Sequence, residues 1–157
     1  MALEVTASAI VPAPPEDVFA LLSDTARYSE WVTGTEAVTR TDGPASEGST
    51  YDEVNPILGP WKANTHWRVV EHEAPRRSVH STGDLPLSSH FEVVMEVAPE
   101  GDASRVVLTL RGEPALGPIG AVFARLMQCQ VDRDNRRSVE AFAELATREL
   151  GVQQTRA

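Results

Sequence analysis

Cysteine is almost absent from this chain, which has one, Cys129, in 157 residues. A single cysteine cannot close an internal disulfide, and it cannot supply the several thiolates of a structural zinc site. Its place inside a predicted helix indicates a small, partly buried side chain rather than a reactive thiol. Histidine is also rare, and the four are His66, His72, His80 and His90. They are not at metal-ligand spacing and fall on different predicted strands, so we expect no metal site and no cofactor.

Basic residues are scarce as well. The chain has 14 Lys and Arg against 23 Asp and Glu, which gives a net charge of −9. Nucleic acids and anionic membranes attract clustered Lys and Arg, so we expect neither as a partner. The N-terminus lacks the basic start of a secretory signal, and no apolar run approaches the roughly 18 residues that cross a bilayer. These absences predict a cytoplasmic protein with no membrane insertion. The sequence leaves open whether the protein is a monomer or a homodimer.

Motifs of two common enzyme classes are missing. No serine lies in a G-x-S-x-G turn, so a hydrolase triad has no support. Gly112, Gly117 and Gly120 lie between a predicted strand and a predicted helix, but their spacing is neither that of a dinucleotide-binding loop nor that of a P-loop. We interpret these glycines as a flexible entry to the helix.

What the sequence does contain is a clear change of hydrophobic period. Residues 117–150 repeat apolar side chains at three- and four-residue steps, which predicts one long amphipathic helix. Before that segment the period is mostly two, which predicts strands. The expected strands are 3–11, 35–41, 49–55, 61–72, 76–82, 87–97 and 105–111, with short helices at 15–22 and 25–31 and a loop at 55–60. This order predicts an α+β fold in a single domain, residues 1–157, with an antiparallel sheet that carries helices on one face.

Four motifs, in this order along the chain, resemble a known superfamily. They are APPEDVFALLSD at 13–24, YSEW at 28–31, VVEHEAPRR at 69–77 and RVVLTLRGEP at 105–114. Together they resemble the START-like (SRPBCC) superfamily, also called the polyketide cyclase/dehydrase and lipid-transport or Bet v 1-like fold. The resemblance implies a helix-grip, a curved antiparallel sheet of about seven strands wrapped around the C-terminal helix with a cavity between them. Members include lipid carriers, ligand-binding proteins, polyketide aromatases and cyclases, and chaperone activators, so the fold alone does not determine function.

The first half of the long helix, residues 119–130, is expected to form one wall of that cavity. Gln130 and Asp134 continue its apolar face with polar groups, which either anchor a ligand or meet solvent and nearby charges. Trp67 is the expected aromatic wall on the sheet, although core packing would explain it equally well. The complete set of candidate ligand contacts is Trp31, Asn55, Trp67, Phe91, Met95, Leu108, Leu110, Val122, Phe123, Leu126, Met127, Gln130 and Asp134.

Tyr51, Glu53 and Asn55 share one side of a predicted strand. If that side faces the cavity, a phenol, a carboxylate and an amide would line it and could orient a ligand. If the register is shifted by one residue, their even-numbered neighbours face the cavity instead. His80 is a further candidate base. His80 and His90 flank one hairpin and could pair across it.

Three functions remain open at this point. The preferred hypothesis is a protein that binds a hydrophobic small molecule, such as a lipid, polyketide or aromatic compound. The alternative is a cyclase or aromatase that works by general acid/base catalysis, with Tyr51, Glu53 and His80 as its catalytic residues. A protein-interaction module of the chaperone-activator type would need an exposed apolar patch, and the sequence pattern does not predict one. His72, at a strand end, is expected to be exposed.

Overall fold

A computed structural model describes residues 3–155. The elements, in chain order, are β1 (Leu3–Val11), α1 (Pro15–Leu22), the 3₁₀ helix η1 (Thr25–Glu30), β2 (Ala37–Thr41), β3 (Thr50–Leu58), β4 (Trp61–Glu73), β5 (Arg77–Thr82), β6 (Ser88–Glu100), β7 (Ala103–Pro114) and α2 (Gly117–Thr155). The seven expected strands and the long helix are all present. Over the described residues, no helix is both long and apolar enough to cross a membrane.

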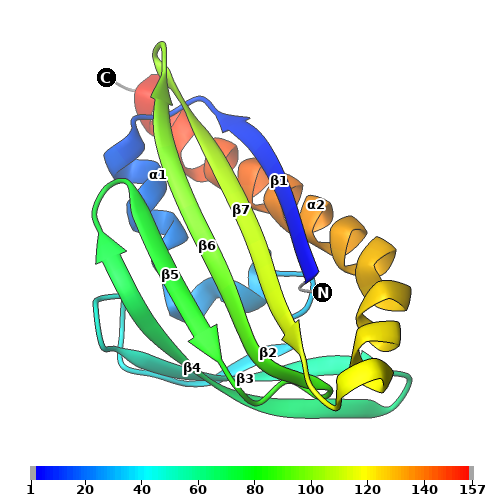
Figure 1. Ribbon diagram of the computed structural model, residues 1–157. Coiled ribbons are helices and arrows are strands. Elements are labelled where there is room, and N and C mark those ends of the chain that lie inside the picture. Colours follow the sequence, from blue (N-terminus) through cyan, green and yellow to red (C-terminus); the bar gives the residue numbers. More distant parts are fainter. Residues whose placement is uncertain (1–2, 156–157) are drawn as a thin grey trace.

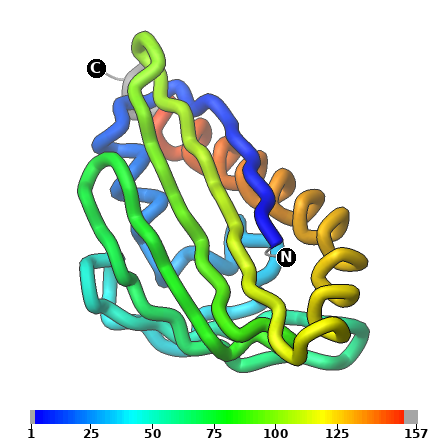
Figure 2. The backbone as a smooth tube through the Cα atoms, in the orientation of Figure 1, coloured from blue at the N-terminus to red at the C-terminus, as the bar shows by residue number. Residues whose placement is uncertain are grey.

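The seven strands form one antiparallel sheet in the order β1-β7-β6-β5-β4-β3-β2. Strands β2 to β7 are neighbours in sequence order, and β1 closes the far edge by pairing with β7, where Val5 lies opposite Leu110. The sheet curves, and α2 crosses its concave side from the end of β7 towards α1 (Figure 1). The same path is clear in the backbone trace (Figure 2). The predicted α+β helix-grip is therefore confirmed.

The second half of α2 packs on the hydrophobic core. Val139, Phe142 and Leu145 are buried there, against α1 and the concave face of the sheet. Phe142 is fully buried and packs edge-on against Trp31 with ring centroids 5.1 Å apart. A buried phenylalanine contributes about 3–5 kcal/mol relative to alanine. The second half of α2 thus anchors the helix, while its first half lies over space that the core does not fill.

The predicted loop at 55–60 is wrong. Strand β3 continues through Asn55 and Pro56 to Leu58, and Pro56 lies opposite Lys62 of β4. A proline removes one ladder donor, but the register shifts between Pro56 and Leu58, and such bulges accommodate proline in a strand. The longer hairpin extends one wall of the space under α2. The helix also runs past the predicted end at residue 150, to Thr155.

Candidate functional site

A cavity lies between the concave face of the sheet and the first half of α2. Its inner compartment has a volume of about 210 Å³ and is closed at one end by η1 and the segment that follows it. An outer compartment of about 210 Å³ opens between the end of β3, the β5–β6 loop and α2. The two compartments share Pro56, Ile57, Leu85, Phe91, Val131 and Asp134. They therefore adjoin and can hold parts of one ligand.

Most of the predicted ligand contacts line this cavity. The inner compartment contains the predicted residues Trp31, Tyr51, Glu53, Asn55, Trp67, Phe91, Met95, Leu108, Leu110 and Asp134. The outer compartment contains the predicted residues Phe91, Phe123, Met127, Gln130 and Asp134. The structure thus brings both open polar candidates of the helix, Gln130 and Asp134, to the cavity wall.

Two of the predicted ligand contacts, Val122 and Leu126, lie outside the cavity wall. They are 59% and 74% exposed and do not line either compartment. At 3.6 residues per turn they lie roughly 60–100° around the helix from Phe123, whose face turns inward. The apolar face of the helix is therefore wider than the part of it that lines the cavity.

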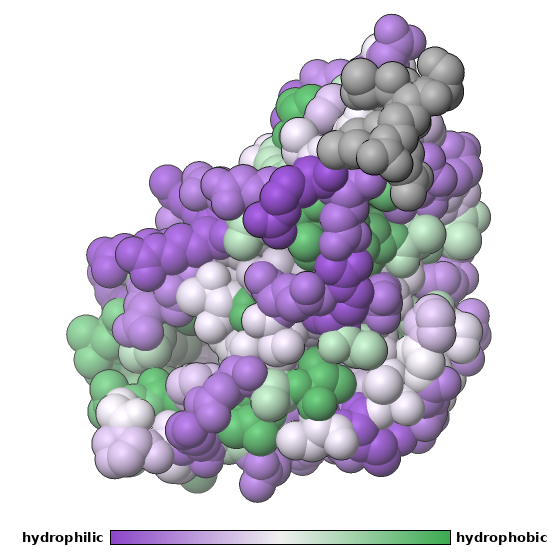
Figure 3. Space-filling model, turned by 180° about the vertical axis from the view of Figure 1, so that it is seen from behind, coloured by the Kyte–Doolittle hydropathy of each residue, from purple (hydrophilic) through white to green (hydrophobic). Residues whose placement is uncertain are grey.

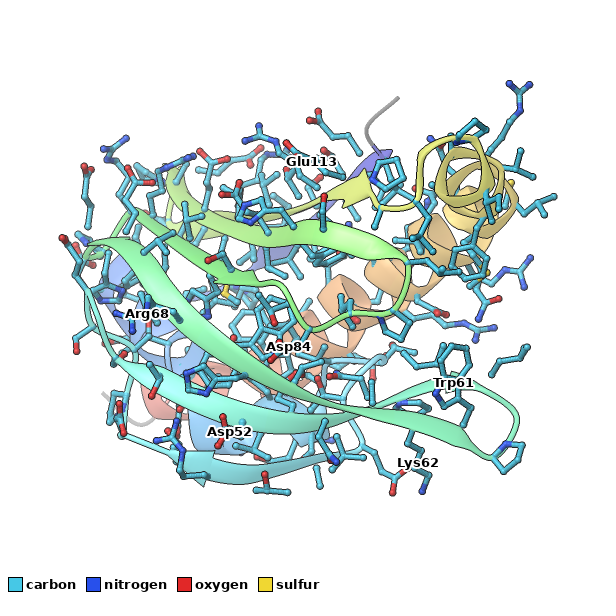
Figure 4. All side chains as sticks on the ribbon, turned by 60° about the horizontal axis from the view of Figure 1, so that its bottom comes forward. Asp52, Trp61, Lys62, Arg68, Asp84 and Glu113 are labelled. Carbon is cyan, nitrogen blue, oxygen red and sulfur yellow. The ribbon has the colours of Figure 1, made fainter. Side chains whose placement is uncertain are left out.

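The same apolar face overturns the expectation that no apolar patch is exposed. Leu116, Ile119, Val122 and Leu126 are all exposed at the start of α2. Seen from behind, hydrophobic residues gather at the lower left, on the side where α2 begins (Figure 3). Figure 4 places Trp61, which is also exposed, on that side of the molecule at the far end of the β3–β4 hairpin. The exposed apolar patch that a protein-interaction module would need is therefore present at the start of α2.

The register of β3 places Tyr51, Glu53 and Asn55 on the concave face. All three are buried and line the inner compartment. Their neighbour Asp52 points to the outer face, where its carboxylate accepts a hydrogen bond from Arg40 and contacts His66. Of the two registers left open by the sequence, the structure adopts the one that faces the phenol, the carboxyl and the amide inward.

Glu53 is held by a hydrogen-bond chain of fixed direction. Trp67 Nε1, which can only donate, donates to Thr65 Oγ1 at 2.9 Å. The Thr65 hydroxyl donates to Asn55 Oδ1, and Asn55 Nδ2 donates to Glu53 Oε2 at 3.1 Å. One carboxylate oxygen of Glu53 is therefore fixed by the protein. Thr65 was not predicted as a site residue, although it alternates with Trp67 on β4.

Burial has the largest effect on the pKa of Glu53, a residue that is only 4% exposed. Removing the carboxylate from water disfavours its charged form and raises its pKa from the ordinary 4.5 to about 7, against the opposing hydrogen bond from Asn55. A carboxyl with this pKa exchanges a proton readily near neutral pH, which is what a general acid or base requires.

Tyr51 and His80 form the second polar pair of the site. The Tyr51 hydroxyl lies 2.8 Å from His80 Nδ1, and His80 is fully buried. Burial lowers the pKa of His80 to about 3, so the ring is neutral near pH 7, and burial raises the pKa of Tyr51 well above 10. The expected pairing of His80 with His90 is wrong, because His80 lies opposite Val93 and His90 contacts Glu92.

Several wall residues were not predicted as contacts. Tyr28 packs edge-on against Tyr51, with ring centroids 5.3 Å apart, and lines the inner compartment. Tyr28 Oη and Trp31 Nε1 are buried and have no hydrogen-bond partner among the described residues. Asn135 also lines the compartment, and its amide donates to Leu108 O at 3.0 Å. The YSEW motif was the available signal for Tyr28, but periodicity could not show which way its ring points. Within residues 3–155, no three His, Cys, Asp or Glu side chains gather as a metal site would require.

Comparisons with known proteins agree with this geometry. The model of the family described as polyketide cyclase / dehydrase and lipid transport matches residues 2–147. The chain is 30% identical over 142 residues to the uncharacterized protein Rv1546 of Mycobacterium tuberculosis, which covers 88% of this chain and 94% of that protein. It is 28% identical over 137 residues to the protein of the same organism named Toxin Rv0910, covering 85% and 93%. Its fold is similar to the crystal structure of the Zhui aromatase/cyclase from a Streptomyces species, with a TM-score of 0.78, 19% identity and coverage of 94% and 95%.

Proposed function

Because this chain belongs to the polyketide cyclase/dehydrase and lipid-transport family, we propose that its cavity binds a hydrophobic small molecule. The observation that carries this proposal is the two-compartment cavity between the sheet and α2, whose inner wall is largely apolar. Pockets that bury drug-sized ligands span roughly 300–1,000 Å³. The inner compartment, at about 210 Å³, is below that range. A drug-sized ligand would therefore occupy both compartments, and a smaller ligand would occupy the inner compartment alone.

The polar groups of the wall indicate what the ligand carries. Tyr51, Glu53 and Asn55 place a phenol, a carboxyl and an amide on an otherwise largely apolar inner wall. A few polar groups on an apolar wall orient a ligand that carries matching polar atoms, such as a ring system that bears carbonyl groups. These groups favour an oxygenated aromatic or polyketide-like compound over a simple acyl chain.

The binding proposal is tested by titration with 2-tetralone, a bicyclic aromatic ketone, and with decane as an oxygen-free comparison. Trp31 and Trp67 both line the inner compartment, so bound ketone is expected to change their fluorescence in a variant that lacks Trp61. Titration calorimetry measures the affinity of the two variants below, because each of them adds an indole. Met95→Trp fills the inner compartment and is expected to weaken binding at least tenfold, whereas Leu126→Trp on the exposed face leaves it unchanged. Equal affinity in both variants, or none in the parent, would refute the proposal.

A second function is favoured by one specific observation, the buried carboxyl of Glu53 on the cavity wall. We propose that Glu53 removes a proton from the carbon next to a ligand carbonyl, and that Tyr51 donates to the carbonyl oxygen as negative charge develops there. The C–H bond breaks, its proton joins the Glu53 carboxylate, and the oxygen takes the phenol proton to give an enol. This step is the common first stage of cyclisations that join a carbon to a neighbouring carbonyl.

The catalytic proposal is tested by measuring how fast the α-protons of 2-tetralone exchange in deuterium oxide. Proton NMR gives the exchange rate, and the protein is expected to raise it above the uncatalysed rate. Glu53→Gln keeps the side-chain shape and an acceptor for Asn55 but cannot take a proton. It is expected to remove the catalysed exchange while the ketone still binds. Exchange by this variant at the parent rate would exclude Glu53 as the base.

A further inference from the structure

The hydrogen bonds of Tyr51 do not end at His80. His80 Nε2 lies 2.9 Å from Ser78 Oγ, and Ser78 Oγ lies 3.2 Å from His72 Nδ1. Tyr51, His80 and Ser78 are all buried, whereas His72 is half-buried. Its ring packs against Phe19 of α1 at a tilt of 44°, with ring centroids 5.2 Å apart. A continuous chain of four side chains therefore runs from the cavity wall, through the sheet interior, to the partly open end near α1.

A bulge in β4 makes this chain possible. Val69 lies opposite His80 and His72 lies opposite Ser78, but the register shifts between Val69 and Glu71. Without that shift the two-residue period would turn His72 to the outer face, away from Ser78. His72 is therefore half-buried, and the exposure predicted from its place at a strand end is wrong. The bulge brings a third polar residue into line with His80 and Ser78 on the concave side.

We propose that Tyr51, His80, Ser78 and His72 form a proton path that returns a proton to Tyr51 from solvent during enol formation in the closed cavity. The proposal rests on the catalytic function argued above. It assigns His80 and Ser78 as proton carriers and His72 as the group that exchanges protons with water. Nothing in the binding function requires such a path.

Each transfer along the path balances. Tyr51 gives its phenol proton to the ligand oxygen and takes one from His80 Nδ1. As His80 Nδ1 releases that proton, His80 Nε2 accepts the hydroxyl proton of Ser78, and Ser78 accepts one from His72 Nδ1. Solvent then protonates His72 Nε2. The net result is one proton moved from solvent to the ligand oxygen, with His80 and His72 each left protonated on Nε2 in place of Nδ1. The reverse transfer, when an enol returns to the ketone, restores the first tautomer of each ring.

The neutrality of His80 supports this route rather than opposing it. Burial disfavours a charged imidazolium at His80 and a free phenolate at Tyr51. A ring that accepts a proton on one nitrogen while it releases one from the other never carries a net charge. The chain therefore moves a proton through a region in which isolated charges are costly.

The alternative explanation is that the chain only satisfies buried polar groups. Ser78→Ala separates the two explanations, because it breaks the path between His80 and His72 but leaves the Tyr51–His80 contact. Ser81→Ala is the matched control, since Ser81 lies on the same strand with its side chain on the opposite face. With 2-tetralone as the probe, we expect Ser78→Ala to slow α-proton exchange about 10- to 100-fold, the lower range of general acid/base effects. The affinity for the ketone should stay within a factor of about two in both variants, and Ser78→Thr should restore the rate because it keeps the hydroxyl.

His72→Ala provides a readout that a structural role would not move. Its exchange rate is expected to fall in dilute buffer and to recover when free imidazole, which can carry protons to Ser78, is added. The plot of rate against deuterium content should be curved in the parent protein, because several protons move together, and closer to linear in Ser78→Ala. Parent-like rates in both Ser78→Ala and His72→Ala would overturn the path even if Glu53→Gln is inactive. Binding without any exchange in the parent protein would overturn the catalytic function and the path together.

Discussion

Replacing Glu53 with glutamine should change the pH dependence of stability in a direction that burial of the carboxyl dictates. In the folded protein the pKa of Glu53 is raised from 4.5 to about 7, so the folded state holds this proton more tightly than the unfolded chain. Between these two values the unfolded chain has lost the proton while the folded protein keeps it. Stability contributed by the neutral carboxyl is therefore complete below about pH 4.5 and is lost as the pH rises to about 7.

The size of this loss follows from the two pKa values. Each tenfold difference in proton affinity corresponds to about 1.4 kcal/mol, so the change from 4.5 to about 7 amounts to roughly 3 kcal/mol. Glutamine is neutral at every pH and keeps an oxygen for the Asn55 amide. Glu53→Gln should thus match the parent protein near pH 4 and be more stable by roughly 3 kcal/mol at pH 8.

Urea unfolding at pH values from 4 to 8 measures this difference directly. Glu113→Gln is the matched control, because Glu113 is exposed and its substitution should not change the pH profile relative to the parent. A constant difference between Glu53→Gln and the parent across this range would refute the assignment of Glu53 as a buried, readily protonated carboxyl. A larger stability of the parent at pH 8 would refute it as well.

Further substitutions test the division of α2 and the hydrogen bonds of the site. Phe142→Ala, in the packed half of the helix, should lower the free energy of unfolding by about 3–5 kcal/mol, measured by urea unfolding. Leu126→Ser, on the exposed face of the other half, should change it by less than about 0.5 kcal/mol in the same assay. Asn55→Ala removes the donor to Glu53 and should raise the pKa of that carboxyl further, so the pH-dependent loss of stability should extend above pH 7. If Phe142→Ala and Leu126→Ser lowered the free energy of unfolding equally, the division of α2 into a packed and an exposed half would be wrong. An unchanged pH profile in Asn55→Ala would contradict the effect of the Asn55 hydrogen bond on the pKa of Glu53.

Much of the fold could be predicted because it depends on period and order. Alternation marked the strands, and the three- and four-residue steps marked α2. The predicted loop at 55–60 failed because proline and glycine rules are local, whereas β3 is held by pairing with β4 over its full length. Pairing and bulges depend on partners distant in sequence, which a single-strand pattern does not contain.

The sequence predicted which side chains of the candidate site belong together, but it did not predict which way they face or what they contact. Tyr51, Glu53 and Asn55 lie on one side of β3 in either register, so the sequence could group them but could not say which way they face. Val122 and Leu126 lie outside the cavity wall, because an apolar stripe on a helix does not show how much of that stripe the sheet covers. His72 was predicted to be exposed because it lies at a strand end, but a bulge in β4 turns its side chain to the concave side, where it is half-buried. The contact of Tyr51 with His80 crosses two strand pairings, and no sequence spacing encodes it.

The most direct test of the account is an NMR measurement of contacts between 2-tetralone and methyl-labelled protein. The central claim is that the ligand lies between the sheet and the first half of α2. It predicts nuclear Overhauser effects from the ketone to the methyl groups of Met95 and Leu108, which line the inner compartment, and none to Leu126, which is exposed. Contacts to Leu126 without contacts to Met95 and Leu108 would contradict the claim.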